Sequence, residues 1–368
     1  MVVLTALAFV IALLCGGLIV GGRLGLGRTR YGEDKPQRFH VGDVSRLGGL
    51  AVGAGLSLAW ITGALIDGRL VGLNLYLDIW YVLSWLLVLL PAVVVGQMED
   101  VTQRLSVRYR LLATVLSGGL ACFFLDAGVP RLGVDWLDAI LLAWPWAGGL
   151  LALLAIAGLP HAFNIIDGYN GLAGTVALLV CLALAHVALQ VGDRALAAQM
   201  MALAGATGGF LFWNYPRGLI FAGDGGSYLW GGVIALACVT LVERHPTVSP
   251  WFPALLLIYP VWETVFSIYR KSVRGGSPSV ADALHFHQLI YRRLVRRVIH
   301  DDHARQILTR NNRTSPYLWG FTALTVFPAV LFWQNTPVLM FFCGLFVVTY
   351  VLAYLAIVRF KVPGWLRR

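Results

Sequence analysis

Four carboxylates in this sequence stand in stretches that also carry glycine, where acids could hold a metal ion beside a phosphate. Glu99 and Asp100 belong to GQMEDVTQRLSVRYRLLA, Asp167 to HAFNIIDGYNGLAG, and Asp224 to NYPRGLIFAGDGGSYLWGG. Glycine lets a backbone approach a phosphate closely and form turns that other residues cannot form. Carboxylates at such turns suit Mg²⁺, which takes oxygen ligands from one or two acids and from substrate phosphates. Any one stretch alone is weak evidence, because turns use Gly and Asp for purely conformational reasons.

Other metal and nucleotide motifs are missing from the sequence. Its five cysteines lie in apolar runs and form no C-x-x-C pair, so we interpret them as small buried hydrophobic residues. No Cys/His set has zinc spacing, and no G-x-x-x-x-G-K-[ST] segment is present. The net charge of +10 comes without a DNA- or RNA-binding motif, so nucleic acid is not an expected partner. In a membrane protein such a charge reports orientation and anionic lipids or substrates.

The elements that must position these acids are membrane-spanning helices. Charged residues make up 12% of the 368 residues and hydrophobic residues 58%, whereas a soluble domain carries about 25% charged residues. We therefore predict an all-α polytopic membrane protein, with one integral-membrane domain over residues 1–368. Since a span needs roughly 20 apolar residues, the sequence predicts about eleven helices, at 2–22, 47–66, 79–98, 110–126, 138–158, 172–191, 195–213, 227–242, 251–269, 317–333 and 338–358.

Basic residues predict the orientation of these spans. With the N-terminus periplasmic and the C-terminus cytoplasmic, 24 of the 28 Lys and Arg residues fall in cytoplasmic segments, and the outer loops keep Arg69, Arg131, Arg194 and Arg244. Basic loops resist translocation, which explains such an asymmetry. The first apolar run has no basic residue before it and three arginines after it, so we interpret it as a retained span of a bacterial inner-membrane protein. This topology brings all four acids to the cytoplasmic face.

The longest cytoplasmic loop is predicted at residues 270–316 and holds ten basic residues. Leu289, Ile290, Leu294, Val298 and Ile299 recur in it at helical spacing, which predicts an amphipathic helix on the inner leaflet. Two histidines, His285 and His287, precede that stretch within SPSVADALHFHQL. They are either solvated loop residues or donors to a pyrophosphate.

The sequence resembles the polyprenyl-phosphate N-acetylhexosamine-1-phosphate transferases of glycosyltransferase family 4, in particular their O-antigen and teichoic-acid initiating branch. Five ordered blocks between Arg38 and Leu294 carry the resemblance: KPQRFHVGDVSRLGGLAVG, the Glu99–Asp100 block, NIIDGYNGLAG, the Asp224 block and GGSPSVADALHFHQL. Four positions depart from the family pattern: Ser45 replaces a proline, Glu99 the first aspartate of a pair, Asn170 a second aspartate and Gln288 a histidine.

The resemblance implies transfer of a sugar-1-phosphate from a UDP-sugar to undecaprenyl phosphate, with release of UMP. It implies Mg²⁺, with Mn²⁺ as an alternative, held by Asp224. Asp100, assisted by Glu99, would keep the lipid phosphate deprotonated, and Asp167 would belong to the same catalytic set. Expected partners are polyprenyl phosphate, a UDP-N-acetylhexosamine, membrane lipids and a second copy of the chain. The expected substrate-binding residues are Arg46, Asn164, Asn170, Asn214, His285, His287 and Arg292, although Asn164 and Asn214 could equally be helix caps.

Two other interpretations stay open at this stage. Intramembrane acids such as Glu263 mark ion paths in transporters, so a transporter or flippase of a lipid-linked anion is the main alternative. The other acids cluster at one end of the spans, however, whereas transporters bind substrates near the midplane. A CDP-alcohol phosphotransferase is the second alternative, but DGYNGLAG lacks the arginine of that family's motif.

Overall fold

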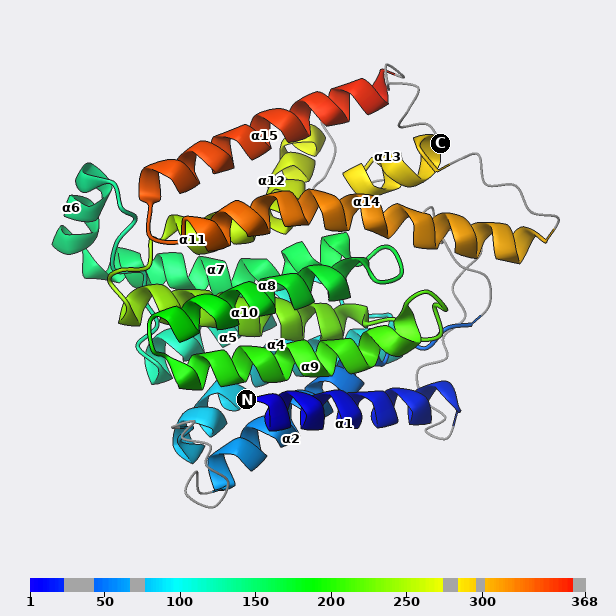
Figure 1. Ribbon diagram of the computed structural model, residues 1–368, viewed down its shortest axis with the longest axis horizontal. Helices are drawn as coiled ribbons and strands as arrows, with labels where there is room; N and C mark the ends of the chain where they lie inside the picture. Colours follow the sequence, from blue (N-terminus) through cyan, green and yellow to red (C-terminus); the bar gives the residue numbers. More distant parts are fainter. Residues whose placement is uncertain (23–42, 67–76, 274–283, 296–301, 360–368) are drawn as a thin grey trace.

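The computed structural model describes residues 1–22, 43–66, 77–273, 284–295 and 302–359 of the chain. Long helices dominate these residues, as the apolar runs predict, and they pack into one bundle (Figure 1). Among the described residues the one pairing of extended backbone is an isolated parallel bridge between Ser45 and Ile220. The protein is therefore an all-α polytopic membrane protein.

Nine helices are long and apolar enough to cross a membrane within the described part of the chain. The other two predicted spans, 251–269 and 317–333, fall on the broken pair α11–α12 and on α14. Helix α14 already begins at His303, inside the predicted loop 270–316. The helix bounds are α1 Val2–Val20, α2 Gly48–Leu65, α4 Ile79–Thr102, α5 Val107–Phe124, α6 Asp135–Ala143, α7 Pro145–Ile166, α8 Leu172–Gln190, α9 Arg194–Asn214, α10 Gly223–Arg244, α11 Trp251–Leu256, α12 Ile258–Val273, α13 Phe286–Arg293, α14 His303–Leu331 and α15 Thr336–Val358.

Helix α10 is the core of the bundle, and its residues from Gly223 to Val242 are all buried. Glycines permit this burial, because they let neighbouring backbones come close, as in other packed membrane helices. A Cβ atom on Gly225 would lie 1.9 Å from Nε2 of Gln97 on α4, and one on Gly231 would lie 2.4 Å from the backbone of Pro160 on α7. The position of α10 is therefore fixed from several sides.

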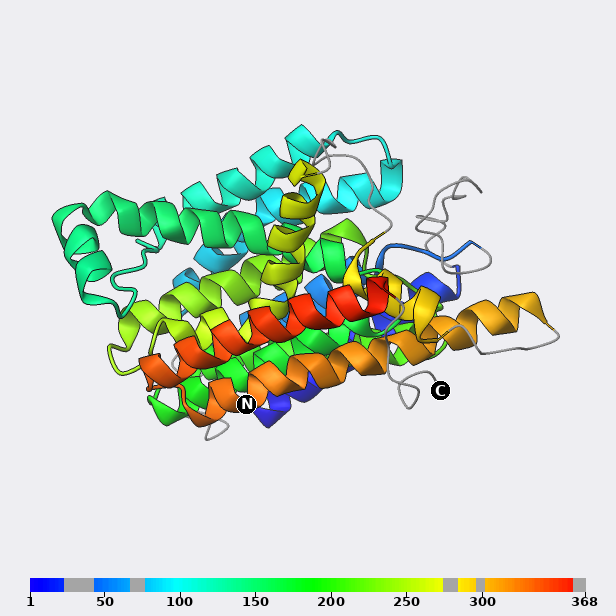
Figure 2. The same ribbon diagram turned by 90° about the horizontal axis from the view of Figure 1, so that it is seen from above.

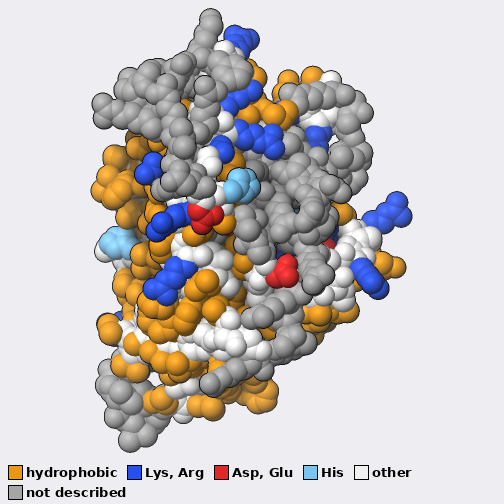
Figure 3. Space-filling model, turned by 90° about the vertical axis from the view of Figure 1, so that its right-hand side faces the viewer, with side chains coloured by type: hydrophobic (Ala, Val, Ile, Leu, Met, Phe, Trp, Pro, Cys, Tyr) orange, Lys and Arg blue, Asp and Glu red, His pale blue; other side chains and the backbone are white. Residues whose placement is uncertain are grey.

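The connections between helices gather at two opposite ends of the bundle. The α4–α5, α7–α8 and α9–α10 connections lie at one end, which we call the loop end, and α6 lies at the other (Figures 1 and 2). Lys and Arg side chains are prominent on the loop end (Figure 3). Two of the arginines predicted for outer loops are at the α6 end, where Arg131 donates to the carbonyl of Val242 and Arg244 pairs with Asp193. The loops thus separate into the two predicted groups.

Helices α12 and α13 depart from the regular bundle. Helix α12 lies steeply across the direction of the other long helices (Figures 1 and 2). Helix α13 follows it in sequence, and its residues from Phe286 to Tyr291 are buried. Leu289 and Ile290 of the expected amphipathic helix therefore pack inside the protein, since they are 1% and 3% exposed. Val298 and Ile299 lie outside the described residues.

Candidate active site at the loop end

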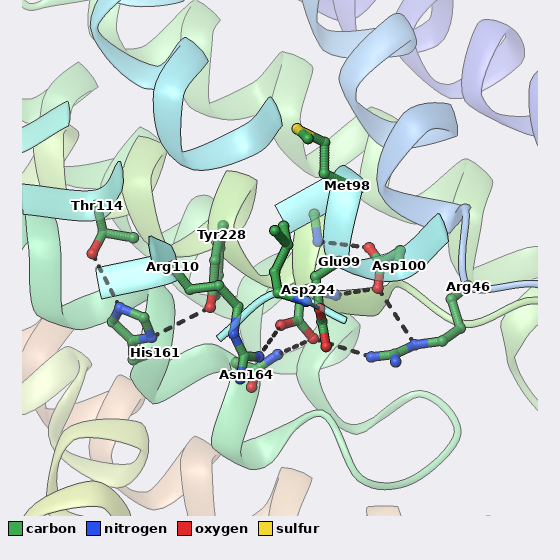
Figure 4. A network of polar contacts seen from close by, with 12 residues as sticks. Arg46, Met98, Glu99, Asp100, Arg110, Thr114, His161, Asn164, Asp224 and Tyr228 are labelled. Atoms are coloured by element: carbon green, nitrogen blue, oxygen red, sulfur yellow. Dashed lines mark hydrogen bonds and ion pairs between the residues drawn. The ribbon is translucent and has the colours of Figure 1, made fainter. Parts of the chain in front are cut away.

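Asp224, in the first turn of α10, is the hub of a polar centre at the loop end (Figure 4). Its Oδ1 accepts from Nη2 of Arg46 at 3.0 Å and from Nδ2 of Asn164 at 2.9 Å. Its Oδ2 accepts from Nη1 of Arg110 at 2.6 Å. Asp224 is only 3% exposed, so a carboxylate there needs such charged partners. The structure thus joins residues that lie up to 178 positions apart in the chain.

Asp100, near the end of α4, binds the backbone at the start of α10, where Asp224 lies. Its two oxygens accept from the backbone N–H groups of Asp224 and Gly225, each at 2.8 Å. Carboxylates stabilise helix N-termini in this way, because the first N–H groups of a helix have no partner within it. Nε of Arg46 lies 3.4 Å from the same carboxylate. Asp100 is fully buried, so its observed contacts hold the start of α10 and the Arg46 side chain in place.

The backbone before α2 determines where Arg46 lies. Residues on either side of it pair with the segment that leads into α10: Phe221 N donates to the Ser45 carbonyl at 2.8 Å and Gly48 N to the Phe221 carbonyl at 2.9 Å. Gly223 then turns the chain into α10 with φ +71°, and a Cβ there would meet both Asp100 oxygens at 2.4 Å. A glycine is required at this position both for the turn and for the close approach.

Glu99 makes different contacts from its neighbour Asp100. Its Oε2 accepts from the backbone N–H of Leu105 at 2.8 Å and so closes the turn between α4 and α5. Gln103 ends α4 in the left-handed conformation, with φ 51°. The shorter aspartate that the family pattern has here would have to reach the same N–H group with one methylene less.

Asp167 lies directly after α7, one turn beyond Asn164, so the end of α7 supplies two side chains to the loop end. Burial raises the pKa of the Asp167 carboxyl to about 7; the charge of Arg46 lowers that pKa, and the charge of Asp224 raises it. Asp167 is therefore close enough to both residues to sense their charges. The structure thus brings Arg46, Asp100, Asn164, Asp167 and Asp224 into one centre.

Asn170 and Asn214 tie loops together beside this centre. The Asn170 side chain donates to Oδ1 of Asn312 on α14 at 3.0 Å. Asn214 donates to the Ile220 carbonyl at 2.7 Å and accepts from the Gly171 N–H at 2.6 Å. Both are buried. Their observed contacts hold the α7–α8 and α9–α10 connections together.

The two histidines form a separate group, centred on Glu263 of α12. Nδ1 of His285 lies 3.0 Å from Oε1 of Glu263, and the same oxygen accepts from the Phe286 N–H at 3.1 Å. The His287 ring stacks on His285, with 5.3 Å between centroids, and its Nδ1 is buried without a hydrogen-bond partner. Burial lowers the pKa of His287 to about 3, so this ring is neutral at pH 7. Arg292 is exposed at the end of α13.

The donor set fits a hard cation such as Mg²⁺. Among the described residues, no group of three His, Cys, Asp or Glu side chains is gathered tightly enough to hold a metal by itself. Mg²⁺ does not require such a cage, because it usually keeps several waters and takes one or two carboxylates plus substrate phosphates. Asp224 and Asp167 offer carboxylate oxygens; Asp224 pairs with the guanidinium groups of Arg46 and Arg110, and Asp167 senses the charge of Arg46.

Sequence reasoning missed Arg110 and the polar side chains behind it. Arg110 lies within VRYRLLA, near the start of α5, and the sequence does not distinguish it from the other basic residues there. Its helical spacing from Thr114 puts both on one face of α5. His161 and Tyr228 carried no comparable hint, because each sits in a largely apolar helix.

Comparison with known proteins matches the part of the chain that carries this centre. Residues 82–242, which include Asp100, Asp167 and Asp224, match the model of glycosyl transferase family 4. The chain is 27% identical to a probable undecaprenyl-phosphate N-acetylglucosaminyl 1-phosphate transferase of Bacillus subtilis strain 168, over 69% of this chain and 68% of that protein. It is 28% identical to the undecaprenyl-phosphate alpha-N-acetylglucosaminyl 1-phosphate transferase of Escherichia coli K12, over 70% and 69%.

A shorter stretch is similar to an enzyme that acts on another sugar. It is 35% identical to the phospho-N-acetylmuramoyl-pentapeptide-transferase of a Synechococcus species, strain JA-3-3Ab, over 47% of this chain and 53% of that protein. The matched stretches, the ordered motifs and the centre at the loop end agree with one another. Residues 82–242 are thus similar to glycosyl transferase family 4, and the relatives matched over about 70% of the chain are undecaprenyl-phosphate N-acetylglucosaminyl 1-phosphate transferases.

Proposed function

We propose that this protein transfers an N-acetylhexosamine-1-phosphate from a UDP-sugar to undecaprenyl phosphate and releases UMP. This reaction would be the first membrane step in the synthesis of O-antigen or another cell-envelope polysaccharide. The observation that carries the proposal is the polar centre itself: carboxylates from α4, α7 and α10 meet Arg46 and Arg110 at one end of a membrane bundle. Two anionic substrates, one of them a lipid, could meet there.

The charges of the centre support a role for a divalent cation. Asp100, Asp167 and Asp224 formally carry three negative charges, against two positive charges on Arg46 and Arg110. A site that must also bind a pyrophosphate and a lipid phosphate needs more positive charge than this. We propose that Asp224, together with Asp167, holds Mg²⁺, with Mn²⁺ as a substitute. When bound, the ion neutralises charge on the transferred phosphoryl group.

The two arginines could exchange a carboxylate partner for a phosphate. A guanidinium binds both groups through the same paired N–H donors. Arg46 and Arg110 hold Asp224 in the present structure, and their side chains are 16% and 20% exposed, so both can also reach an incoming phosphate. Asn164 donates an N–H group to the same centre. These residues would bind and orient the donor pyrophosphate.

The role of Asp100 follows from its burial. The second pKa of a phosphate is about 6, so a base has little work to do at neutral pH. Because both Asp100 oxygens already accept backbone N–H groups, we propose that Asp100 mainly fixes α10 and Arg46. Glu99 would assist by closing the α4–α5 turn. His285, His287 and Arg292 would contribute from α13 on the donor side.

We propose a single displacement. An oxygen of the lipid phosphate attacks the β-phosphorus of the UDP-sugar, and the bond from that phosphorus to the oxygen bridging to the α-phosphate breaks. UMP leaves with the bridging oxygen. Bringing two anions together in a fixed orientation supplies much of the rate enhancement in such reactions. A two-step route through an aspartyl intermediate would instead need a free carboxylate nucleophile.

The localisation proposed is the bacterial inner membrane, with the loop end in the cytoplasm. The positive-inside asymmetry of the sequence supports it. The transporter alternative loses its main support, because Glu263 is bound by His285, by the Phe286 N–H and by the Tyr350 hydroxyl at 2.7 Å. Those contacts fasten α13 to α12 and α15, and they account for a buried acid without an ion path.

The test is an assay of purified protein with undecaprenyl phosphate and a panel of UDP-N-acetylhexosamines. UMP should appear together with a lipid-linked diphospho-sugar, only when a divalent cation is present. Labelled UMP should exchange into UDP-sugar only when lipid-linked product is supplied; exchange by delipidated protein would refute single displacement. Release of CMP from a CDP-alcohol, or transport without release of any nucleotide, would refute the proposed function.

A further inference from the structure

A chain of three polar side chains runs away from the carboxylate centre, and the proposed reaction gives it no role. It links Thr114 of α5, His161 of α7 and Tyr228 of α10, and it ends beside Arg110 (Figure 4). Thr114 is fully buried and Tyr228 is 1% exposed. Polar groups this deep in a membrane bundle need a partner for each donor and acceptor.

The contacts of Thr114 favour one nitrogen of His161 as the one that carries the proton. The Thr114 hydroxyl has one proton, and it donates that proton to the Leu111 carbonyl at 2.9 Å. Nε2 of His161 lies 3.0 Å from the same hydroxyl oxygen. Without a proton on Nε2, two lone pairs would face each other at that distance. A proton on Nε2 avoids this contact and leaves Nδ1 as an acceptor.

The free Nδ1 in turn orients the Tyr228 hydroxyl. The phenolic oxygen lies 3.4 Å from Nδ1, so the hydroxyl proton points at the imidazole. A lone pair of that oxygen is then available on the side where the Arg110 guanidinium lies. A hydroxyl turned the other way would aim its proton at a cation. Donation from Nε2 to Thr114 and from the Tyr228 hydroxyl to Nδ1 thus agrees with the contacts at both ends of the chain, the Leu111 carbonyl and the Arg110 guanidinium.

We propose that His161 is a positioning residue: through Tyr228 it keeps Arg110 aimed at Asp224 and at the phosphate that Arg110 would bind. Arg110 reaches Asp224 with Nη1 at 2.6 Å, and its Nε is buried without a hydrogen-bond partner. The Tyr228 oxygen is a neutral group next to this guanidinium that can fix its rotation. The kinetic part of this inference rests on the proposed function; the protonation state of the ring does not.

The kinetic test uses replacements that keep one half of the imidazole. His161→Asn places an amide oxygen near the position of Nδ1, so it can still accept from Tyr228 and should keep kcat within about threefold of wild type. His161→Gln keeps the group near Nε2 and His161→Phe keeps neither; both should lower kcat about tenfold, the size of one lost buried hydrogen bond. The matched control is His186→Asn, at an exposed position of α8, which should leave kcat unchanged.

A double-mutant cycle separates positioning from damage to the fold. Tyr228→Phe should cost about as much as His161→Phe, and the double variant should be no worse than either, because His161 acts through Tyr228. Additive losses would overturn the inference, as would equal damage from Asn and Gln at position 161.

The second measurement needs no turnover. In ¹⁵N-histidine-labelled protein, the resonances lost in His161→Asn should show a neutral ring protonated on Nε2. A proton on Nδ1, or on both nitrogens, would overturn the inference even in a fully active enzyme. A protein with the expected ring but no UMP release with any UDP-sugar would instead refute the proposed function.

Discussion

The two ends of the bundle both contain an aspartate paired with arginine, yet they are built differently. At the α6 end, Asp193 caps the start of α9 through the Leu196 N–H and pairs with Arg244 and His245, which follow each other in the chain. At the loop end, Asp224 receives its partners from three other segments of the chain: the one before α2, α5 and α7.

The charges of the two ends differ as well. At the α6 end, Asp193 pairs with Arg244 and His245, and Arg131 donates to carbonyls at the end of α10. In the polar centre at the loop end, the three carboxylates of Asp100, Asp167 and Asp224 face the two guanidinium groups of Arg46 and Arg110. Balanced local pairs close a helix bundle, whereas unbalanced pairs drawn from distant segments leave charge for a ligand to complete. The comparison therefore distinguishes structural polar clusters from functional ones in the same molecule.

Labelling of introduced cysteines tests the comparison most directly, because each position is either accessible from outside the cell or not. Single cysteines at positions 135 and 244 should react with an impermeant thiol reagent in intact cells, and cysteines at 104, 216 and 305 should react only after the membrane is opened. The five native cysteines lie in helices, and the unaltered chain measures their background. External labelling at position 305 would contradict the assignment of the loop end to the cytoplasm.

Removing the aspartate charge at each end should affect different properties: turnover at the loop end and, slightly, stability at the α6 end. Asp224→Asn keeps the size of the side chain but removes the charge that pairs with Arg46 and Arg110 and that we propose binds Mg²⁺; turnover should fall at least about a hundredfold. Asp193→Asn is the matched control, because Asn still caps a helix and the lost pair with Arg244 is partly exposed; it should cost about 1 kcal/mol of stability or less and leave turnover unchanged. Similar turnover in the two variants would contradict the contrast.

Within the loop end, the adjacent acids should differ in sensitivity. Asp100→Asn weakens two charge-assisted hydrogen bonds to the start of α10, each worth about 1.5–3 kcal/mol, so both turnover and the melting temperature should fall. Glu99→Asp restores the common family residue and should be tolerated, provided that it still reaches the Leu105 N–H. Equal and severe loss of Mg²⁺-dependent activity in both variants would indicate a shared metal site instead.

Acidification should loosen α13 while sparing the α6 end. The pKa of His287 is about 3 in the folded protein, against about 6.5 for an unfolded histidine. Below pH 6.5 the unfolded state therefore binds a proton at His287 that the folded state does not bind. The free energy of unfolding is unaffected by this group well above pH 6.5 and declines as the pH falls below it. Between pH 6.5 and pH 5 the loss is about 2 kcal/mol. The protection factors of the α13 amides against hydrogen exchange should fall over that range, and His287→Gln should remove this pH dependence.

The sequence predicts the spans and most of the centre, because hydropathy and ordered motifs are local properties. Asp100, Asn164 and Asp224 each lie in a short recognisable block. Arg110 escapes such reading, because its importance depends on a contact with Asp224 across 114 positions. The glutamate inside α12 is similar: hydropathy flags Glu263 as unusual, but only the packing of α13 shows that His285 is its partner. The bounds of α14 also differ, because its first half is too polar to be identified as part of a span.

The complete burial of α10 has a consequence for how the enzyme would tolerate different membranes. A helix that touches lipid must tilt or shift when the bilayer thickens or thins. Helix α10 has no lipid-facing side from Gly223 to Val242, so adjustments to bilayer thickness fall on the outer helices first. Asp224, at the first turn of α10, is thereby insulated from the acyl-chain length of the surrounding lipids. Reconstitution into bilayers of different thickness should change protein tilt before it changes the geometry around the reacting phosphates.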